Sequence, residues 1–517
     1  MSWERQGFST LDGHCVLSNK FFTDNPSTHY QIQSRLQCKI DSLLINNVCI
    51  GRDISTEFWT DRSAFTSIDI PKDIVKKGTN EVRVFCKDLA WTGGHSHNSF
   101  IIREKECDES EYIKIIIDKE NHLFDSLPGK IDLEYSAIAT SKLRLQMENS
   151  FRSKLLDTTI NVPAGKDTIS IGLGSMNNLP GFYQCIATLE DKYFSGDIEW
   201  IAVSPENLVS ENLHAPDFTD YWQAAMSELA DIQPDFKVIY SDRLSTPTKK
   251  AYIVEMQSVG NLTVRAYYYV PRTAGPHYAI LHLPGYGDGF ENISHLRNDA
   301  TERVDMALCV RGHGLSADIF NPGFDVPGIW GYKLHEKDSI AYRQIYLDCV
   351  RAVDFLCSRP EVDNMRIGVA GGSQGGGLAL ATAALCRERI AACAYFDPFP
   401  CDISEHINIR TICRQQLEDY MNYYGNPCSL QDVLKIQSYI DARNFAPDIS
   451  AKVLYATALF DDDCHPHVGF AAYNDIVSDK RYHIYPDDSH LGESDYFSYF
   501  MQWFDSVFSM DNDTEKH

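Results

Sequence analysis

A single serine lies between glycines at the end of an apolar segment, where it has the surroundings of a catalytic nucleophile. Residues 366–372 are expected to form a buried strand, Ser373 follows them, and an Ala/Leu-rich helix begins directly behind it. Gly371, Ser373 and Gly375 match the G-x-S-x-G pattern of a nucleophile elbow. Glycines are needed because a turn this sharp leaves no room for side chains beside the serine. The first amides of the helix would then face the place where an oxyanion forms.

A serine nucleophile needs a general base and an acid that orients it, and both residue types follow later in the chain. Residues 452–460 are expected to form a buried strand that leads directly into Asp461. Residues 481–486 are expected to form a short last strand, with His490 in the loop behind it. Serine, acid and histidine in this order, each just after a strand, are typical of α/β-hydrolases. Such a histidine takes the serine proton, and the acid fixes the imidazole tautomer.

The loop that begins at Asp461 offers more than one acid and more than one metal-binding residue type. Asp462 and Asp463 follow, so residue type alone leaves three candidates, and we favour Asp461 because it comes directly off the strand. His465 and His467 lie in the same loop, but the ligand types are mixed and their spacing fits no zinc pattern. We therefore predict no metal site there, and we expect the two histidines to line the rim of the pocket.

Further segments occur in a fixed order around the elbow. They are residues 217–229, Arg311-Gly-His313, residues 339–355, Gly371-Gly-Ser-Gln-Gly-Gly376, Pro398-Phe-Pro-Cys-Asp402 and Phe470-Ala-Ala-Tyr-Asn474. Together they make about residues 205–509 similar to the acetyl xylan esterase and cephalosporin C deacetylase family of the α/β-hydrolase superfamily. Two positions depart from the family pattern: His313 replaces a glutamine, and Leu491 replaces the glutamate that follows the base.

The resemblance assigns a role to each candidate residue. It implies that Ser373 is the nucleophile, Asp461 the orienting acid and His490 the general base. The oxyanion hole of the family uses two backbone N–H groups, which belong here to Tyr286 and Gln374. The resemblance implies no metal and no organic cofactor.

The departures from the family pattern concern residues outside this set. The resemblance implies that Arg311 and His313 support the active-site loop, so the change at His313 should leave the chemistry intact. The carboxylate missing at Leu491 is expected to shift the pH optimum.

The implied activity is removal of O-acetyl groups from acetylated xylo-oligosaccharides or related small acetyl esters through an acetyl-serine intermediate. Alternatives are a serine hydrolase of another specificity, such as a peptidase or a longer-chain carboxylesterase, and a glycan-binding protein with an inactive hydrolase domain. A peptidase of the prolyl-oligopeptidase type would need a propeller of about 40–45 residues per blade. About 205 residues precede the hydrolase-like part, and they contain no such repeat.

Composition narrows the class of protein. At 517 residues the chain is long enough for two or three domains, and with 44% hydrophobic and 23% charged residues it is globular. A formal net charge of −25 disfavours nucleic acid and anionic membrane surfaces as partners. The 15 cysteines are scattered without a C-x-x-C motif, and no signal peptide is visible. Buried free thiols in the cytoplasm explain this pattern better than disulfides do.

The residues before 205 have a different sequence pattern, in which short segments of alternating apolar and polar residues are separated by turn residues. We predict a β-sandwich over residues 1–107, weakly similar to galactose-binding-like jelly rolls, and an immunoglobulin-like β-sandwich over residues 108–204. Residues 205–517 would form the α/β catalytic domain. The N-terminal part could bind glycans, act as a spacer or cover the catalytic mouth, and the chain could form a homo-oligomer.

Overall fold

The computed structural model describes residues 14–24, 26, 30–34, 39–54, 66–87, 100–104, 111–174, 179–189, 192–287, 289–290, 302–323, 328–490 and 496–510. The chain divides into two compact units. The first comprises Met1–Glu120, Leu127–Asn177 and Tyr183–Ile201. The second comprises Asn121–Ser126, Asn178–Phe182 and Ala202–His517.

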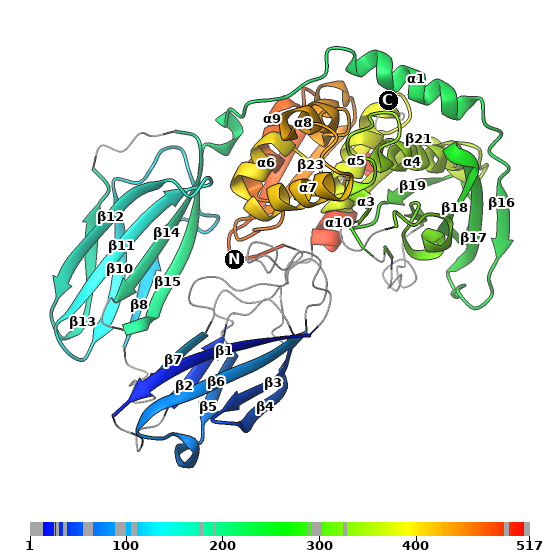
Figure 1. The fold of residues 1–517 in the computed structure, drawn as a ribbon. Helices are drawn as coiled ribbons and strands as arrows, with labels where there is room; N and C mark the ends of the chain where they lie inside the picture. The colour runs from blue at the N-terminus through cyan, green and yellow to red at the C-terminus, as the bar shows by residue number, and fades with distance from the viewer. Residues whose placement is uncertain are drawn as a thin grey trace. The chain divides into compact units, whose positions relative to one another are not determined.

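The N-terminal strands of the first unit form two sheets, drawn in blue in Figure 1. One has the order β1-β6-β3-β4 and the other β5-β2-β7. The strands are β1 (His14–Thr23), β2 (Tyr30–Ser34), β3 (Lys39–Ile45), β4 (Val48–Ile54), β5 (Thr66–Ile70), β6 (Gly78–Lys87) and β7 (Phe100–Glu104). Ile32 of β2 packs with Leu43 and Val84 of the other sheet in one hydrophobic core, so the inner faces of the two sheets are apolar.

Later strands form two further sheets, with the orders β13-β10-β8 and β12-β11-β14-β15-β9. They are β8 (Tyr112–Ile116), β9 (Leu123–Phe124), β10 (Lys130–Ala137), β11 (Ser141–Asn149), β12 (Lys154–Val162), β13 (Gly165–Gly172), β14 (Gly181–Leu189) and β15 (Lys192–Val203). Alternate residues of β10 and β11 are buried, as a strand with one core-facing side requires. The described residues before 205 thus have the strand-rich structure that was expected. Their division into the two named sandwich types stays a prediction.

The second unit is built on a nine-stranded sheet in the order β16-β17-β18-β20-β19-β21-β22-β23-β24. The strands are β16 (Lys237–Tyr240), β17 (Lys249–Ser258), β18 (Leu262–Pro271), β19 (His277–His282), β20 (Val304–Cys309), β21 (Val362–Gly372), β22 (Ala392–Phe396), β23 (Lys452–Ala458) and β24 (Lys480–Tyr485). From β20 to β24 all neighbouring strands are parallel. Their C-terminal ends therefore meet at one edge, where open α/β sheets build their sites.

Helices lie on both faces of this sheet (Figure 1). They are α1 (Phe218–Ala230), α3 (Gly328–Gly331), α4 (Ala341–Cys357), α5 (Gln374–Leu385), α6 (Ile403–Ile409), α7 (Thr411–Tyr423), α8 (Leu430–Gln437), α9 (Pro466–Asp475) and α10 (Tyr496–Met510). Ala392, Ala394 and Phe396 of β22 face α10. Tyr395, on the opposite face, stacks on Tyr455, which contacts α9. Because both faces are covered, these strands are apolar throughout rather than alternating.

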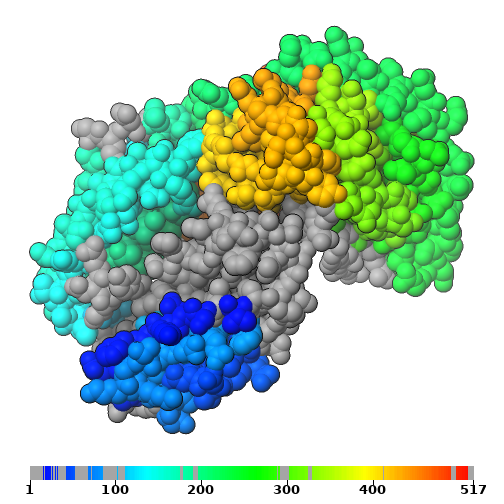
Figure 2. Space-filling model, viewed as in Figure 1, coloured from blue at the N-terminus to red at the C-terminus, as the bar shows by residue number. Residues whose placement is uncertain are grey.

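The described structure agrees with the sequence expectation for the elements that carry the candidate residues. The expected strand before Ser373 is β21 and the helix after it is α5, while β23 and β24 precede Asp461 and His490. Helices α6 to α8 lie at the surface of this unit, in yellow and orange in Figure 2. Among the described helices, none combines the length and apolar composition needed to cross a membrane.

Candidate active site

Ser373 occupies a strained turn between β21 and α5. Its backbone has φ 56° and ψ −125°, a conformation that residues with a side chain rarely adopt. Two hydrogen bonds hold the turn to the end of β22: the Ser373 N–H donates to the Phe396 carbonyl at 3.0 Å, and the Phe399 N–H donates to the Ser373 carbonyl at 2.9 Å. The turn is therefore fixed by its neighbours and not only by its own sequence.

The glycines of the motif are required by close backbone contacts. A Cβ at Gly371 would lie closer than 3.0 Å to the backbone of Gly375. A Cβ at Gly375 would lie closer than 3.0 Å to the carbonyl oxygen of Leu283, at the end of β19. Real Cβ atoms essentially never approach backbone atoms this closely. The absence of side chains thus lets the start of α5 press against both its own strand and the neighbouring one.

The structure brings Ser373, His490 and Asp461 together in one hydrogen-bonded line. Nε2 of His490 lies 3.1 Å from Oγ of Ser373, and Nδ1 of His490 lies 2.6 Å from Oδ2 of Asp461. His490 is 6% exposed and Asp461 is 1% exposed. An imidazole in this position can accept the serine proton while the carboxylate holds its other N–H.

Backbone geometry distinguishes Asp461 from the two acids that follow it. Oδ1 of Asp461 accepts the backbone N–H groups of Asp463 at 2.8 Å and Cys464 at 2.7 Å. The carboxylate of Asp463 instead pairs with Arg410, and the side chain of Asp462 is exposed. Of the three candidates, Asp461 is therefore the one in contact with the imidazole.

The charges of this pair shift their pKa values in opposite directions. Burial alone lowers the pKa of His490, but the negative charge of Asp461 and its hydrogen bond outweigh burial and raise that pKa above its ordinary 6.5. Burial alone raises the pKa of Asp461, but the charge of His490 and its hydrogen bond outweigh burial and lower that pKa. The electrostatic arrangement thus favours an ionised Asp461 beside an imidazole that is more basic than usual.

A second buried carboxyl group, that of Asp397, lies behind Asp461. It is 0% exposed and accepts hydrogen bonds from Thr457 Oγ1 at 2.5 Å, Tyr455 Oη at 3.1 Å and the Ala458 N–H at 3.0 Å. Burial and the negative charge of Asp461 raise the pKa of Asp397 well above its usual range. Asp397 was not among the sequence candidates, although an aspartate directly after the buried strand β22 was a signal for it.

The predicted oxyanion donors lie at the start of α5 and in the turn after β19. Gln374 is the first residue of α5, and helix-starting N–H groups have no partner within the helix. The phenol oxygen of Tyr286 accepts the N–H of Trp330 at 2.9 Å, which anchors the side chain of the turn residue to α3. The rings of Tyr286 and Trp330 both contact Phe399.

Arg311 and His313 are buried and hydrogen-bonded to residues near the start of α5 and on α4. Arg311 is fully buried and binds Asp348 of α4 through two hydrogen bonds, from Nε at 2.8 Å and Nη2 at 2.6 Å. Nδ1 of His313 lies 3.2 Å from the carbonyl of Arg311, and its Nε2 lies 3.2 Å from Nε2 of Gln374. Both side chains are thus held by buried hydrogen bonds, and their role in supporting the active-site loop stays a prediction. The remaining departure, Leu491, lies outside the described residues.

The histidines of the Asp461 loop are packed inside the protein. His465 and His467 are 5% and 6% exposed, and the His465 ring makes an edge contact with Phe182. Nδ1 of His465 accepts the N–H of His467 at 3.1 Å and so caps the start of α9. Burial lowers the pKa of His467 to about 4. These contacts give the two residues packing and capping roles, in place of the expected position at a pocket rim.

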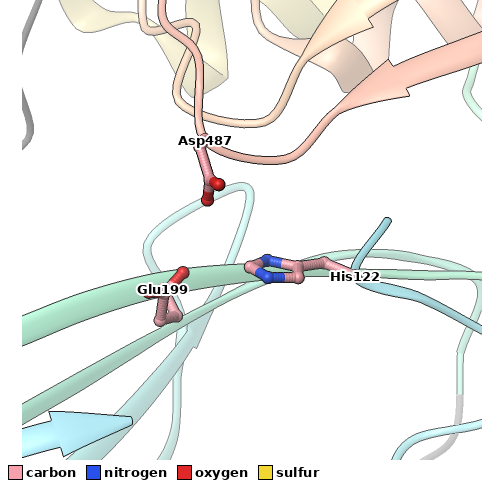
Figure 3. Close-up of side chains that lie close together, drawn as sticks. All are labelled: His122, Glu199 and Asp487. Atoms are coloured by element: carbon pink, nitrogen blue, oxygen red, sulfur yellow. The ribbon is translucent and has the colours of Figure 1, made fainter. Parts of the chain in front are cut away.

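Figure 3 shows three other side chains that carry metal-ligand atoms, those of His122, Glu199 and Asp487. Glu199 belongs to the first compact unit, whereas His122 and Asp487 belong to the second.

Most of the C-terminal part of the chain is similar to known proteins. The sequence profile of the acetyl xylan esterase (AXE1) family matches residues 206–506. Acetyl esterase Axe7A of Xylanibacter ruminicola is 25% identical over 350 residues, which cover 64% of this chain and 76% of that protein.

Solved structures of two related enzymes superpose on the same part of the chain. An acetyl xylan esterase from a Paenibacillus species has 27% identity and a TM-score of 0.54, covering 58% of this chain and 98% of its own. Acetyl xylan esterase 1 from a Thermoanaerobacterium species has 28% identity and a TM-score of 0.52, covering 58% and 96%. The chain therefore belongs to the acetyl xylan esterase family of carboxylic ester hydrolases, and its C-terminal part has the α/β-hydrolase fold.

Proposed function

We propose that this protein is a serine esterase that removes O-acetyl groups from acetylated xylo-oligosaccharides or related small acetyl esters. The observation that carries the proposal is the hydrogen-bonded line from Ser373 through His490 to Asp461, at a strained elbow in a chain of this family. Membership of the family supports an acetyl ester as substrate, and the likeness to two acetyl xylan esterases of known structure supports xylan as its source.

The first half of the reaction transfers the acetyl group to the enzyme. His490 Nε2 takes the proton of the Ser373 hydroxyl as Oγ attacks the acetyl carbonyl carbon, and Asp461 stabilises the imidazolium that forms. The carbonyl oxygen becomes an oxyanion, which accepts hydrogen bonds from the N–H groups of Tyr286 and Gln374. The C–O bond to the sugar then breaks, and His490 returns the proton to the departing hydroxyl oxygen.

The second half of the reaction restores the free serine. A water molecule gives its proton to His490 as its oxygen attacks the acetyl carbon of acetyl-Ser373. A second oxyanion forms in the same place and collapses with cleavage of the Ser373 Oγ–C bond. The proton held by His490 returns to Oγ, and acetic acid leaves as acetate.

Several features of the rest of the chain belong to the same proposal. Cys309, Cys349 and Cys393 are buried free thiols, which supports a reducing, cytoplasmic location.

The strand-rich residues before 205 are proposed to form a jelly-roll and an immunoglobulin-like domain, with a role in holding glycan or spacing the catalytic part. The protein is also proposed to form a homo-oligomer. Measuring the molar mass of the protein in solution by light scattering would test this proposal.

The substrate is tested by comparing three ester and amide classes. Acetate release from acetylated xylo-oligosaccharide should be fast, and hydrolysis of a long-chain ester and of a peptide amide should be slow or absent. Rapid cleavage of the long-chain ester without acetate release would reject the acetyl assignment. Cleavage of the amide would favour the peptidase alternative.

The nucleophile is tested with Ser373→Ala. Loss of the hydroxyl should reduce the rate by at least about a thousandfold, because residual catalysis then comes only from binding and the oxyanion hole. Ser358→Ala, which removes a hydroxyl bonded to the Phe355 carbonyl at the end of α4, is a matched control that should keep its activity. Turnover by the Ser373 variant above that level would argue against covalent catalysis.

A further inference from the structure

We infer that the side chain of Gln374 is a positioning residue for the oxyanion hole, because it holds the peptide group whose N–H is the second donor. The inference rests on the proposed serine-esterase function and deepens it. Gln374 already contributes its backbone N–H in that proposal. Its side chain would act separately, through the turn after β19.

The side chain of Gln374 is fully buried and reaches back to that turn. Its Nε2 donates to the carbonyl oxygen of Gly285 at 3.1 Å and to that of Pro284 at 3.3 Å. Its Oε1 accepts the hydroxyl of Tyr342, on α4, at 2.8 Å. The amide orientation is therefore set by its partners: the nitrogen faces carbonyl acceptors and the oxygen faces a hydroxyl donor.

The bond to Gly285 acts directly on the proposed donor of Tyr286. The Gly285 carbonyl and the Tyr286 N–H belong to one planar peptide group, in which they point in opposite directions. A donor that draws this carbonyl toward the buried Gln374 side chain therefore aims the N–H away from the interior. The same hydrogen bond polarises the peptide group and strengthens its N–H as a donor.

The turn itself supplies little steric constraint on this peptide. A Cβ at Gly285 would meet no atom of the described residues within 4 Å, and Gly287 has φ +104°, a conformation that suits glycine. Glycines allow a turn to rotate its peptide groups, so a hydrogen bond from outside the turn helps to hold one orientation. Gln374 is the residue that provides this bond.

His313 completes the fixation of the Gln374 amide. Its Nε2 lies 3.2 Å from Nε2 of Gln374 and its Nδ1 lies 3.2 Å from the Arg311 carbonyl. When Nδ1 of His313 carries the proton, its Nε2 accepts one N–H of the Gln374 amide, and the other N–H is shared between the Gly285 and Pro284 carbonyls. Gln374 therefore acts on both oxyanion donors: its own backbone N–H is one of them, and its side chain binds the peptide group that carries the other. Hydrogen bonds through His313 and Arg311 join the Gln374 side chain to α4.

The test uses Gln374→Met, which keeps the length and volume of the side chain and leaves the backbone N–H of residue 374 in place. We expect kcat for acetyl ester hydrolysis to fall about ten- to a hundredfold, less than the 10²–10³ that loss of an entire oxyanion donor costs. KM should stay within about twofold, because the interaction strengthens only when the oxyanion forms.

A short-chain alkylboronic acid provides a second readout, because it forms a tetrahedral adduct with the serine. Its inhibition constant should weaken by the same factor as kcat falls. Thr382→Val is the matched control: it removes another buried hydrogen bond on α5, from Oγ1 to the Leu378 carbonyl at 2.6 Å. It should lower thermal stability and leave kcat and boronic acid affinity unchanged.

The outcomes separate this inference from the proposed function. If wild-type protein releases acetate and Gln374→Met has an unchanged kcat, the positioning role is refuted and the esterase function stands. A raised KM with normal kcat and normal boronic acid affinity would refute it as well. If wild-type protein and the Thr382 variant both fail to react with acetyl esters and with the boronic acid, the function itself fails, and this inference fails with it.

A second variant guards against loss of the fold in Gln374→Met. Gln374→Glu keeps the oxygen that faces Tyr342 but places a carboxylate oxygen against the Gly285 carbonyl. It should reduce kcat at least as strongly as the methionine variant, since the peptide is now repelled rather than held. A folded glutamate variant with wild-type kcat would overturn the inference.

Discussion

Replacing Asp461 with asparagine is expected to stop turnover by reversing the tautomer of His490. Oδ1 of Asp461 accepts the N–H groups of Asp463 and Cys464 at 2.8 and 2.7 Å. An asparagine must keep its carbonyl oxygen at this position, because an NH₂ group there would face two donors. Its NH₂ group then occupies the Oδ2 position, 2.6 Å from Nδ1 of His490, and donates to that nitrogen.

The change of tautomer affects catalysis through Nε2 of His490, the ring nitrogen that faces Ser373. With Nδ1 as an acceptor, neutral His490 carries its proton on Nε2, 3.1 Å from Oγ of Ser373, where it donates and cannot accept. The same aspartate-to-asparagine change in a serine–histidine–aspartate arrangement lowers kcat about 10⁴-fold. At about 1.36 kcal/mol per tenfold, this is a loss of about 5.4 kcal/mol of transition-state stabilisation.

The assay measures initial rates of acetate release, together with thermal unfolding to establish that the variant is folded. Asp462→Asn makes the same chemical change at the adjacent, exposed residue and should keep most of the activity. A kcat for Asp461→Asn within about tenfold of wild type would refute the tautomer argument. An equal loss in both variants would show that the loop, and not the imidazole, was damaged.

The remaining predictions concern pH and the elbow. His490 must be neutral to act as a base, and the net effect of burial and the Asp461 charge raises its pKa above 6.5, so kcat/KM should rise with pH through a midpoint above 6.5. A midpoint below 6.5 would contradict this electrostatic account. Gly375→Ala places a Cβ closer than 3.0 Å to the Leu283 carbonyl oxygen and should destabilise the fold by about 1–3 kcal/mol, measured by chemical denaturation. Gly129→Ala, where a Cβ would meet no described atom within 4 Å, is its control, and equal stability of the two variants would refute the steric argument.

The elements that carry the candidate site could be predicted because their signals are local. An apolar run, a serine between glycines and an Ala/Leu-rich helix describe β21, the turn and α5 without reference to any other part of the chain. The strands before Asp461 and His490 are equally visible, because strands buried on both faces are continuously apolar. The order of these elements then suffices to place three residue types at one edge of a parallel sheet.

Contacts between distant segments could not be predicted in the same way. Asp397 lies behind Asp461 only because β22 and β23 are neighbours in the sheet. His465 and His467 stand in a polar stretch of sequence, yet the chain folds them inward, where burial lowers the pKa of His467. No local pattern records which segments will cover a side chain.

The sequence by itself determined the nucleophile candidate and the order of its partners, since glycine requirements and strand periodicity are properties of short segments, and its ordered motifs carried the resemblance to the family. Only the tertiary structure decided which of three consecutive aspartates meets the imidazole, because two backbone N–H groups of the folded loop hold one carboxylate in place. It also decided that the side chain of Gln374 reaches the peptide of a turn about ninety residues earlier in the chain. Hydrogen bonds of this kind depend on where the sheet brings its loops together, and that is a property of the whole fold.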